Sequence, residues 1–315
     1  MTSPRVCALA GGVGAAKMLR GVLQVVDASS VTAIVNTGDD VTLHGLHVSP
    51  DLDTITYTLA EAVNPETGWG LVGETWNAMT ALDRYGGLTW FRLGDQDMAT
   101  HLYRTQRLRD GLTLGEVTAE ITRAWGLELR LLPVTDDSLE TRVVVEGEGE
   151  IGFQEYFVGR QHNVTVESVR FAGAESATPA PGVLDAIASA SVVLVCPSNP
   201  IVSIGPLLAV PGVQAAVAAR RSSTVAVSPI VAGLALKGPA DRMLRELGHD
   251  ASVVGVARLY REFVATLVID EADQDLAPAV EDAGMRCVVT PTVMRNQDDA
   301  AALARVALGA ADSAL

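Results

Sequence analysis

The stretch ALAGGVGAAK, residues 8–17, lies where an apolar run gives way to glycines and then to alanine-rich sequence. The apolar run over 5–10 and the helical pattern over 14–26 predict a strand, a tight turn and a helix in that order. Glycines at such a turn let the backbone bend sharply and let a phosphate approach the amides at the start of the helix. The alternative interpretation is a tight turn that binds nothing.

This turn completes neither common nucleotide-binding motif. The Walker A pattern is absent, and Lys17 occupies the third-glycine position of the dinucleotide fingerprint. Asn36 also stands near the end of the second predicted strand, where a dinucleotide-binding protein carries a carboxylate. Both departures disfavour a nicotinamide-dependent oxidoreductase.

The remaining sequence alternates short apolar runs with helical patterns, which predicts an α/β fold. We expect a doubly wound, mostly parallel Rossmann-like sheet with helices on both faces, formed by residues 1–315 as a single domain. Residues 141–171 predict a small antiparallel β insertion, and 172–182 a return linker. The predicted strands are 5–10, 31–35, 88–93, 141–146, 151–158, 164–171, 192–196, 224–228, 252–256, 265–269 and 285–289. The predicted helices are 14–26, 53–63, 75–84, 96–109, 113–125, 182–190, 212–220, 238–247, 273–283 and 297–313.

Composition excludes several classes of protein. The 315 residues are 48% hydrophobic and 19% charged, which excludes wholesale disorder. A formal charge of −15 argues against nucleic acid or an anionic membrane as the main partner. The cysteines Cys7, Cys196 and Cys287 lie far apart in apolar runs, which is typical of thiols in a reducing compartment. With no secretion signal and no apolar window of membrane-spanning length, we expect a cytoplasmic protein.

Two acidic segments follow the second predicted strand. In VNTGDD, residues 35–40, the adjacent carboxylates of Asp39 and Asp40 suit a divalent cation such as Mg²⁺, especially beside a phosphate. In SPDLDT, residues 49–54, two further aspartates stand at a predicted helix start. The alternatives are an Asx turn and plain helix-start acids. Because the segments lie close in sequence, we expect their four carboxylates to converge, and to need a metal or a cationic partner.

Other polar residues also follow predicted strands, where open parallel sheets bind their ligands. Arg92 is either a cation facing the acids or an ordinary surface arginine. Ser198 and Asn199, between two prolines in CPSNPIVSIGP, form a stiffened polar loop, and Ser228 opens a similar loop. Lys237 opens KGPA, whose amides are candidates for a second anion.

These motifs, in this order, resemble the 2-phospho-lactate transferase family, which makes the deazaflavin coenzyme F-420 from its precursor Fo. The resemblance spans residues 8 to about 241 and weakens beyond 245. The matching segments are AGGVGAAK, VNTGDD, HGLHVSPDLDTITYTL, GWGLVGETWNA, WFRLGDQDMATHLYRT, FQEYFVG, CPSNPIVSIGPLLAVPG and VAVSPIVAGLALKGPAD.

The resemblance implies an Mg²⁺-dependent transfer of a substituted phosphate. The terminal ribityl hydroxyl of Fo attacks a phosphorus that carries lactate, enolpyruvate or glycerate in a guanosine diphosphate-linked donor, and GMP leaves. Such chemistry needs positioning and charge neutralisation more than covalent catalysis. Relatives also imply a homodimer. The sequence leaves the identity of the three-carbon acid open.

The resemblance also implies residue roles. Asp53 and Asp39 are the catalytic candidates, and Asp39 with Asp40 would hold Mg²⁺. The residues implied to contact Fo are Asp53, Arg92, Thr54 and Asp51. Those implied to contact the nucleotide or donor are Gly11, Gly12, Val13, Gly14, Lys17, Ser198, Asn199 and Ser228.

Two positions depart from the usual pattern: Ala15, where many relatives have a second glycine pair, and Gln96, where LGDRD is usual. The alternative function is a non-catalytic nucleotide-sugar-binding regulator of the related gluconeogenesis-factor family. That family shares the glycine turn and the double aspartate, but it lacks the SPDLDT and WFxLGDxD blocks present here.

Overall fold

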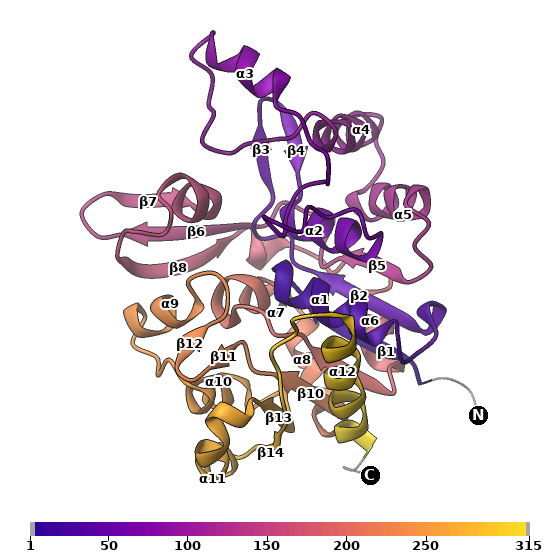
Figure 1. Cartoon of the computed structure of the whole chain (residues 1–315), viewed down its shortest axis with the longest axis vertical. Helices are drawn as coiled ribbons and strands as arrows, with labels where there is room; N and C mark the ends of the chain where they lie inside the picture. The colour runs from indigo at the N-terminus through magenta and orange to yellow at the C-terminus, as the bar shows by residue number, and fades with distance from the viewer. Residues whose placement is uncertain (1–3, 313–315) are drawn as a thin grey trace.

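A seven-stranded parallel sheet forms the centre of the computed structural model, which describes residues 4–312 (Figure 1). Its strand order is β14-β13-β10-β9-β1-β2-β5. The strands are β1 Val6–Ala10, β2 Val31–Val35, β5 Arg130–Pro133, β9 Val192–Val195, β10 Thr224–Val227, β13 Thr266–Ile269 and β14 Arg286–Val289. From β1 the chain builds the sheet one way through β2 and β5, and from β9 it builds the other way. The β1/β9 boundary is therefore the topological switch point, beside which ligands bind in such sheets.

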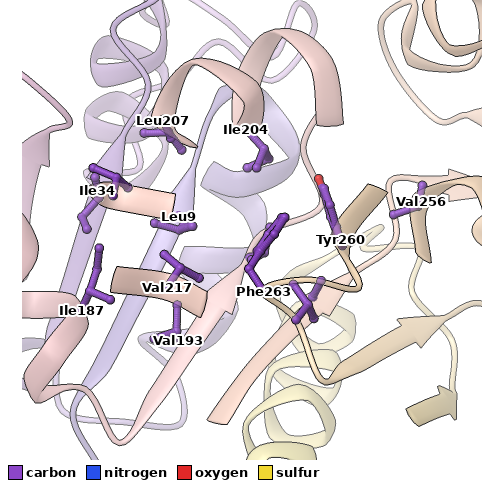
Figure 2. Close-up of a cluster of buried hydrophobic side chains, with 14 of the residues drawn as sticks. Leu9, Ile34, Ile187, Val193, Ile204, Leu207, Val217, Val256, Tyr260 and Phe263 are labelled. Atoms are coloured by element: carbon purple, nitrogen blue, oxygen red, sulfur yellow. The ribbon is translucent and has the colours of Figure 1, made fainter. Parts of the chain in front are cut away.

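Helices cover both faces of this sheet, as predicted. Residues of β1 alternate between two hydrophobic cores, because successive strand side chains point to opposite faces. On one face Ala8 packs with α1 (Gly12–Val22) and α12 (Gln297–Asp312). On the other face Leu9 lies in a cluster with side chains of α6 and α8, shown in Figure 2. The further helices are α2 Pro50–Leu59, α3 Asn77–Asp83, α4 Asp97–Arg109, α5 Leu114–Ala124, α6 Val183–Ser189, α7 Gly205–Ala209, α8 Val213–Ala219, α9 Ala240–Glu246, α10 Val253–Tyr260 and α11 Ala277–Asp282.

Small antiparallel elements decorate the sheet. The predicted insertion is a three-stranded sheet of order β7-β6-β8, built from β6 Glu140–Val145, β7 Gly149–Gly152 and β8 Val166–Ala172. The hairpin β3 (Val41–Leu43) and β4 (Leu46–Val48) rises from the sheet towards α3, at the top of Figure 1. A third pair joins β11 (Ile230–Val231) and β12 (Leu234–Ala235).

Three strand predictions were wrong. Residues 88–93 form an irregular segment. Residues 252–256 begin α10, because the Ser252 side chain accepts the amides of Val254 and Gly255 and caps a helix. The strand predicted over 151–158 ends at Gly152 and is followed by a π-helical turn.

Other elements were missed or lie outside the description. Strand β5 was not predicted, nor was the β3–β4 hairpin. Residue 313, at the end of the helix predicted over 297–313, lies outside the described residues.

Within residues 4–312, no single helix is both long and apolar enough to cross a membrane. The pair Pro200–Ala209 and Val213–Ala219 meets that test only when both parts are counted together, and they are bent by 95°.

Candidate active site

The glycine turn after β1 is tightly enclosed. A Cβ on Gly11 would lie 2.8 Å from both Asp51 Oδ2 and Ser203 Cβ. A Cβ on Gly14 would lie 2.1 Å from the Pro197 carbonyl oxygen, so only glycine fits there. The Ser198 hydroxyl donates a 2.8 Å hydrogen bond to the Gly11 carbonyl. The loop after β9 therefore closes on the turn after β1, at the switch point of the sheet.

Asn36 links the two acidic segments. Its side-chain amide nitrogen lies 3.3 Å from Asp39 Oδ1 and 3.0 Å from Asp51 Oδ2, and it donates to both. Its amide oxygen accepts the Gly38 N–H at 2.8 Å. From the antiparallel insertion, Gln154 donates to Asp39 Oδ2 at 3.2 Å. Sequence reasoning assigned no role to Asn36 or Gln154, yet these amides hold Asp39 in place.

Asp39 and Asp51 are buried beside one another, with 7% and 6% of their surfaces exposed. Burial, followed by the charges of Asp51 and Asp40, raises the pKa of Asp39 well above its usual range. Burial also raises the pKa of Asp51 to about 7, although hydrogen bonds from Asn36 and the Gly12 amide oppose the shift. Burial and mutual repulsion therefore favour the protonated form of these carboxyls, and a bound cation would favour their ionised form.

Asp40 points to the β3–β4 hairpin. Its Oδ2 lies 2.9 Å from His47 Nε2 and accepts the Ser49 hydroxyl at 2.7 Å. Its Oδ1 is buried and has no hydrogen-bond partner among the described residues. Burial raises the pKa of Asp40, and the contacts with His47 and Ser49 oppose that effect. One Asp40 oxygen is thus fixed by protein, and the other is buried without a protein partner.

Asp53 lies on the first turn of α2 and pairs with Arg104 of α4, with Arg104 Nη1 at 3.1 Å from Asp53 Oδ2 and Nη2 bonded to Oδ1. Arg104 is only 1% exposed. His101 Nδ1 lies 3.7 Å from Asp53, and its Nε2 lies 3.2 Å from Asp97. Tyr57 donates to Asp97 at 2.7 Å. A buried polar network therefore fixes the Asp53 carboxylate.

The remaining predicted site residues lie on different segments of the chain. Thr54 is partly exposed on α2, and Lys17 Nζ on α1 donates to the Met294 carbonyl at 3.4 Å. The side-chain oxygens of Asn199 and Ser228 accept hydrogen bonds from backbone amides in their own turns, at residues 201–202 and 230. Arg92 is exposed, and its guanidinium lies 4.2 Å from the Trp76 ring centroid. In residues 4–312, the structure joins the glycine turn, Ser198 and the acids, but not Arg92 or Ser228.

Hydrogen bonds to acidic side chains fix the segment around Gln96. Gln96 Nε2 donates to the Gly73 carbonyl at 2.9 Å, and its backbone amide donates to Glu74 at 2.8 Å. Asp95 accepts both backbone and side-chain hydrogen bonds from Asn77. This network ties the start of α4 to the loop before α3, so Gln96 has a structural role at this position.

Comparison with known families identifies the chain. A family model described as 2-phospho-L-lactate transferase CofD matches residues 6–297. The chain belongs to the 2-phospho-L-lactate transferase family. Within this transferase family, a phosphoenolpyruvate transferase of Kitasatospora aureofaciens is 45% identical over 314 residues, which is 98% of each chain. One of Mycolicibacterium smegmatis is 38% identical over 326 residues, covering 99% of this chain and 100% of the other.

Solved structures support the fold alone. Two crystal structures of one Bacillus halodurans protein, described in one case as a member of the UPF0052 family, superpose with TM-scores of 0.67 and 0.65. They share 15% and 16% sequence identity with this transferase and cover 98% of its chain.

Proposed function

We propose that this transferase moves a phosphoenolpyruvyl group from an enolpyruvyl guanosine diphosphate to the ribityl hydroxyl of Fo. The observation that carries the proposal is the cluster of Asp39, Asp40 and Asp51 against the glycine turn, at the switch point of a chain in the phospholactate transferase family. The enolpyruvyl donor is favoured over lactyl or glyceryl donors by the names of the relatives that match nearly the whole chain. The product is the dehydro form of the F-420 core without glutamates.

The proposed reaction is a displacement at phosphorus. The acceptor oxygen forms a bond to the phosphorus that bears the three-carbon acid, and the bond from that phosphorus to the bridging oxygen breaks. GMP leaves with the electron pair. We assign Asp53 to the acceptor side: its carboxylate is held by Arg104, and its free lone pairs accept the proton that the ribityl hydroxyl loses as the oxygen–phosphorus bond forms. The glycine turn and Ser198 lie on the donor side.

A divalent cation fits this site chemically. Within residues 4–312, no three His, Cys, Asp or Glu side chains form a ready-made metal centre. Mg²⁺ commonly takes one or two carboxylates and completes its shell with water and substrate phosphates. Asp39 and Asp40 would hold it, as supported by the unpartnered Asp40 Oδ1 and the mutual repulsion around Asp39. When bound, Mg²⁺ would neutralise the charge of the diphosphate.

The decisive experiment is a turnover assay read by mass spectrometry. Purified protein is mixed with Fo, Mg²⁺ and, separately, the enolpyruvyl, lactyl and glyceryl guanosine diphosphates. We expect a deazaflavin phosphodiester and stoichiometric GMP, formed fastest with the enolpyruvyl donor. A faster reaction with the lactyl donor would overturn the donor assignment. No product with any donor, in folded and Mg²⁺-supplied protein, would favour the nucleotide-sugar-binding alternative.

A further inference from the structure

Three polar side chains share one face of α4: Asp97, His101 and Arg104. Their spacing in the sequence brings each within reach of the next along the helix. His101 and Arg104 are each 1% exposed, so both side chains are shielded from water. Because Arg104 holds the Asp53 carboxylate, this face of α4 connects His101 to the candidate active site.

The contacts of the His101 ring indicate which nitrogen carries the proton. Nδ1 lies 3.3 Å from Arg104 Nη1, and a guanidinium only donates hydrogen bonds, so Nδ1 accepts and is unprotonated. The distance from Nδ1 to Asp53 Oδ2 is 3.7 Å, which is too long for a hydrogen bond. Nε2 is buried, lies 3.2 Å from Asp97 Oδ2, and has no other hydrogen-bond partner among the described residues. The geometry therefore favours a neutral ring with its proton on Nε2.

Asp97 is the acceptor that this tautomer requires. Its Oδ1 accepts the Tyr57 hydroxyl at 2.7 Å. Burial raises the pKa of Asp97, but its interactions with His101 and Tyr57 outweigh burial and lower that pKa. An ionised carboxylate only accepts hydrogen bonds, so the hydrogen between Asp97 and His101 belongs to Nε2.

Arg104 Nη1 is the junction between this network and the site. It donates to Asp53 Oδ2 at 3.1 Å, to His101 Nδ1 at 3.3 Å and to the His47 carbonyl at 3.4 Å. A guanidinium is planar, so fixing Nη1 also limits the position of Nη2, which bonds to Asp53 Oδ1. His101 therefore orients the guanidinium, and the guanidinium orients Asp53.

We propose that His101 is a positioning residue for the transfer: as a neutral imidazole with its proton on Nε2, it holds Arg104, which keeps Asp53 aimed at the acceptor hydroxyl. The order of hydrogen bonds stands on the geometry, and the acceptor-side role of Asp53 rests on the proposed function. In that reaction Asp53 takes the hydroxyl proton as the new oxygen–phosphorus bond forms, and GMP leaves with the electron pair of the broken bond. His101 neither gives nor takes a proton.

Nitrogen NMR on protein with isotope-labelled histidine tests the tautomer directly. The two ring nitrogens of a histidine give different signals when protonated and unprotonated. The signals of His101 are those missing from the spectrum of His101→Asn, and the chain has only five histidines. Near neutral pH we expect a protonated Nε2 and an unprotonated Nδ1. A doubly protonated ring, or a proton on Nδ1, would overturn the proposal.

Substitutions at His101 separate its two contacts. Asparagine places an oxygen near the position of Nδ1, where it can accept from Arg104, whereas glutamine places its amide near Nε2, where it can donate to Asp97. We expect His101→Leu, which removes both contacts, to lower kcat by about tenfold to a hundredfold and to change the KM for Fo by less than about threefold. His101→Asn should recover more of kcat than His101→Gln. Wild-type kcat in His101→Leu, or better recovery by glutamine, would overturn the proposal.

A core substitution controls for lost stability. Val217→Ala removes buried volume from α8, in the cluster shown in Figure 2. Urea unfolding measures the loss of stability in each variant. We expect Val217→Ala to keep the wild-type kcat. An equal fall in kcat for Val217→Ala and His101→Leu would make the role of His101 merely structural and overturn the proposal.

The two proposals fail in different ways. No transfer to Fo by the wild-type protein would refute the proposed function, and with it the role of His101 in transfer. Transfer by the wild type with an unchanged kcat in His101→Leu would leave the proposed function standing and refute the positioning role alone.

Discussion

The buried ion pair between Arg104 and Asp53 yields a sharp prediction for the variant Arg104→Met. Arg104 is 1% exposed and bonds to both oxygens of a carboxylate that is itself 5% exposed. Burial lowers the pKa of Arg104, but the charge and hydrogen bond of Asp53, with a further contribution from Asp40, together outweigh burial and raise it. Methionine matches part of the side-chain volume and removes the charge, leaving Asp53 buried without its main partner.

Breaking a buried pair by removing one partner costs about 3–5 kcal/mol of unfolding free energy. The same helix offers a control in Arg107, whose side chain is 31% exposed and pairs with Glu120. Exposed pairs contribute about 0–1 kcal/mol, so Arg107→Met should lie within that range. In the double variant Arg104→Met with Asp53→Asn, no buried charge is left unpaired. We therefore expect its loss to be smaller than the sum of the two single losses.

The assay is urea unfolding followed by circular dichroism at constant pH and salt. Wild type and the variants Arg104→Met, Arg107→Met, Asp53→Asn and the double substitution are measured together. A loss below about 1 kcal/mol for Arg104→Met, equal to that of Arg107→Met, would refute the buried-pair argument. Additive losses in the double variant would show that the two side chains do not act as a pair.

Three other predictions concern the glycine turn and the acids. Folding raises the pKa of Asp51 to about 7, so between about pH 4 and 7 the folded chain keeps a proton that the unfolded chain releases. The contribution of Asp51 to the free energy of unfolding therefore falls as the pH rises through this range. In metal-free denaturation, Asp51→Asn should flatten this slope, and an unchanged slope would contradict the assignment. Gly14→Ala should lower the free energy of unfolding in urea by about 1–3 kcal/mol, because the new Cβ clashes with the Pro197 carbonyl. Gly309→Ala is the control and should not destabilise, because its new Cβ meets no atom within 4 Å. Equal effects of the two substitutions would be evidence against the clash. Asp39→Ala should abolish Mg²⁺-dependent transfer in the turnover assay and retain the native circular dichroism spectrum, and wild-type turnover at matched Mg²⁺ would exclude Asp39 from the metal site.

Much of the fold was predictable because buried parallel strands are short apolar runs bounded by turn residues. Strands β1, β9 and β13 have every residue buried and were predicted within one or two residues. Strand β5 was missed because its four residues, RLLP, contain no β-branched side chain. The β3–β4 hairpin had a usable signal: its turn residues His44 and Gly45 both have positive φ, and glycine is typical of such turns.

The site was only partly predictable from the sequence. The acids and glycines occur in local motifs, so their spacing was sufficient to select them. Gln154 reaches Asp39 from the antiparallel insertion, and no local pattern signals a contact of that kind. Arg104 offered a better signal, since Asp97, His101 and Arg104 recur at helical spacing and therefore share one face of the predicted helix. The homodimer and the cytoplasmic location stay predictions.

The raised pKa values at the acidic cluster have a calorimetric consequence. With a pKa of about 7, Asp51 holds a fraction of a proton near neutral pH before any ligand binds. Any ligand that brings positive charge to Asp39 and Asp51 displaces that fraction into the solvent. The heat of binding then includes the ionisation enthalpy of the buffer. The heats measured in phosphate and in Tris should therefore differ by the number of protons released multiplied by the difference between the two ionisation enthalpies. The apparent affinity should also rise as the pH increases through about 7, which couples occupancy of the site to the acidity of its surroundings.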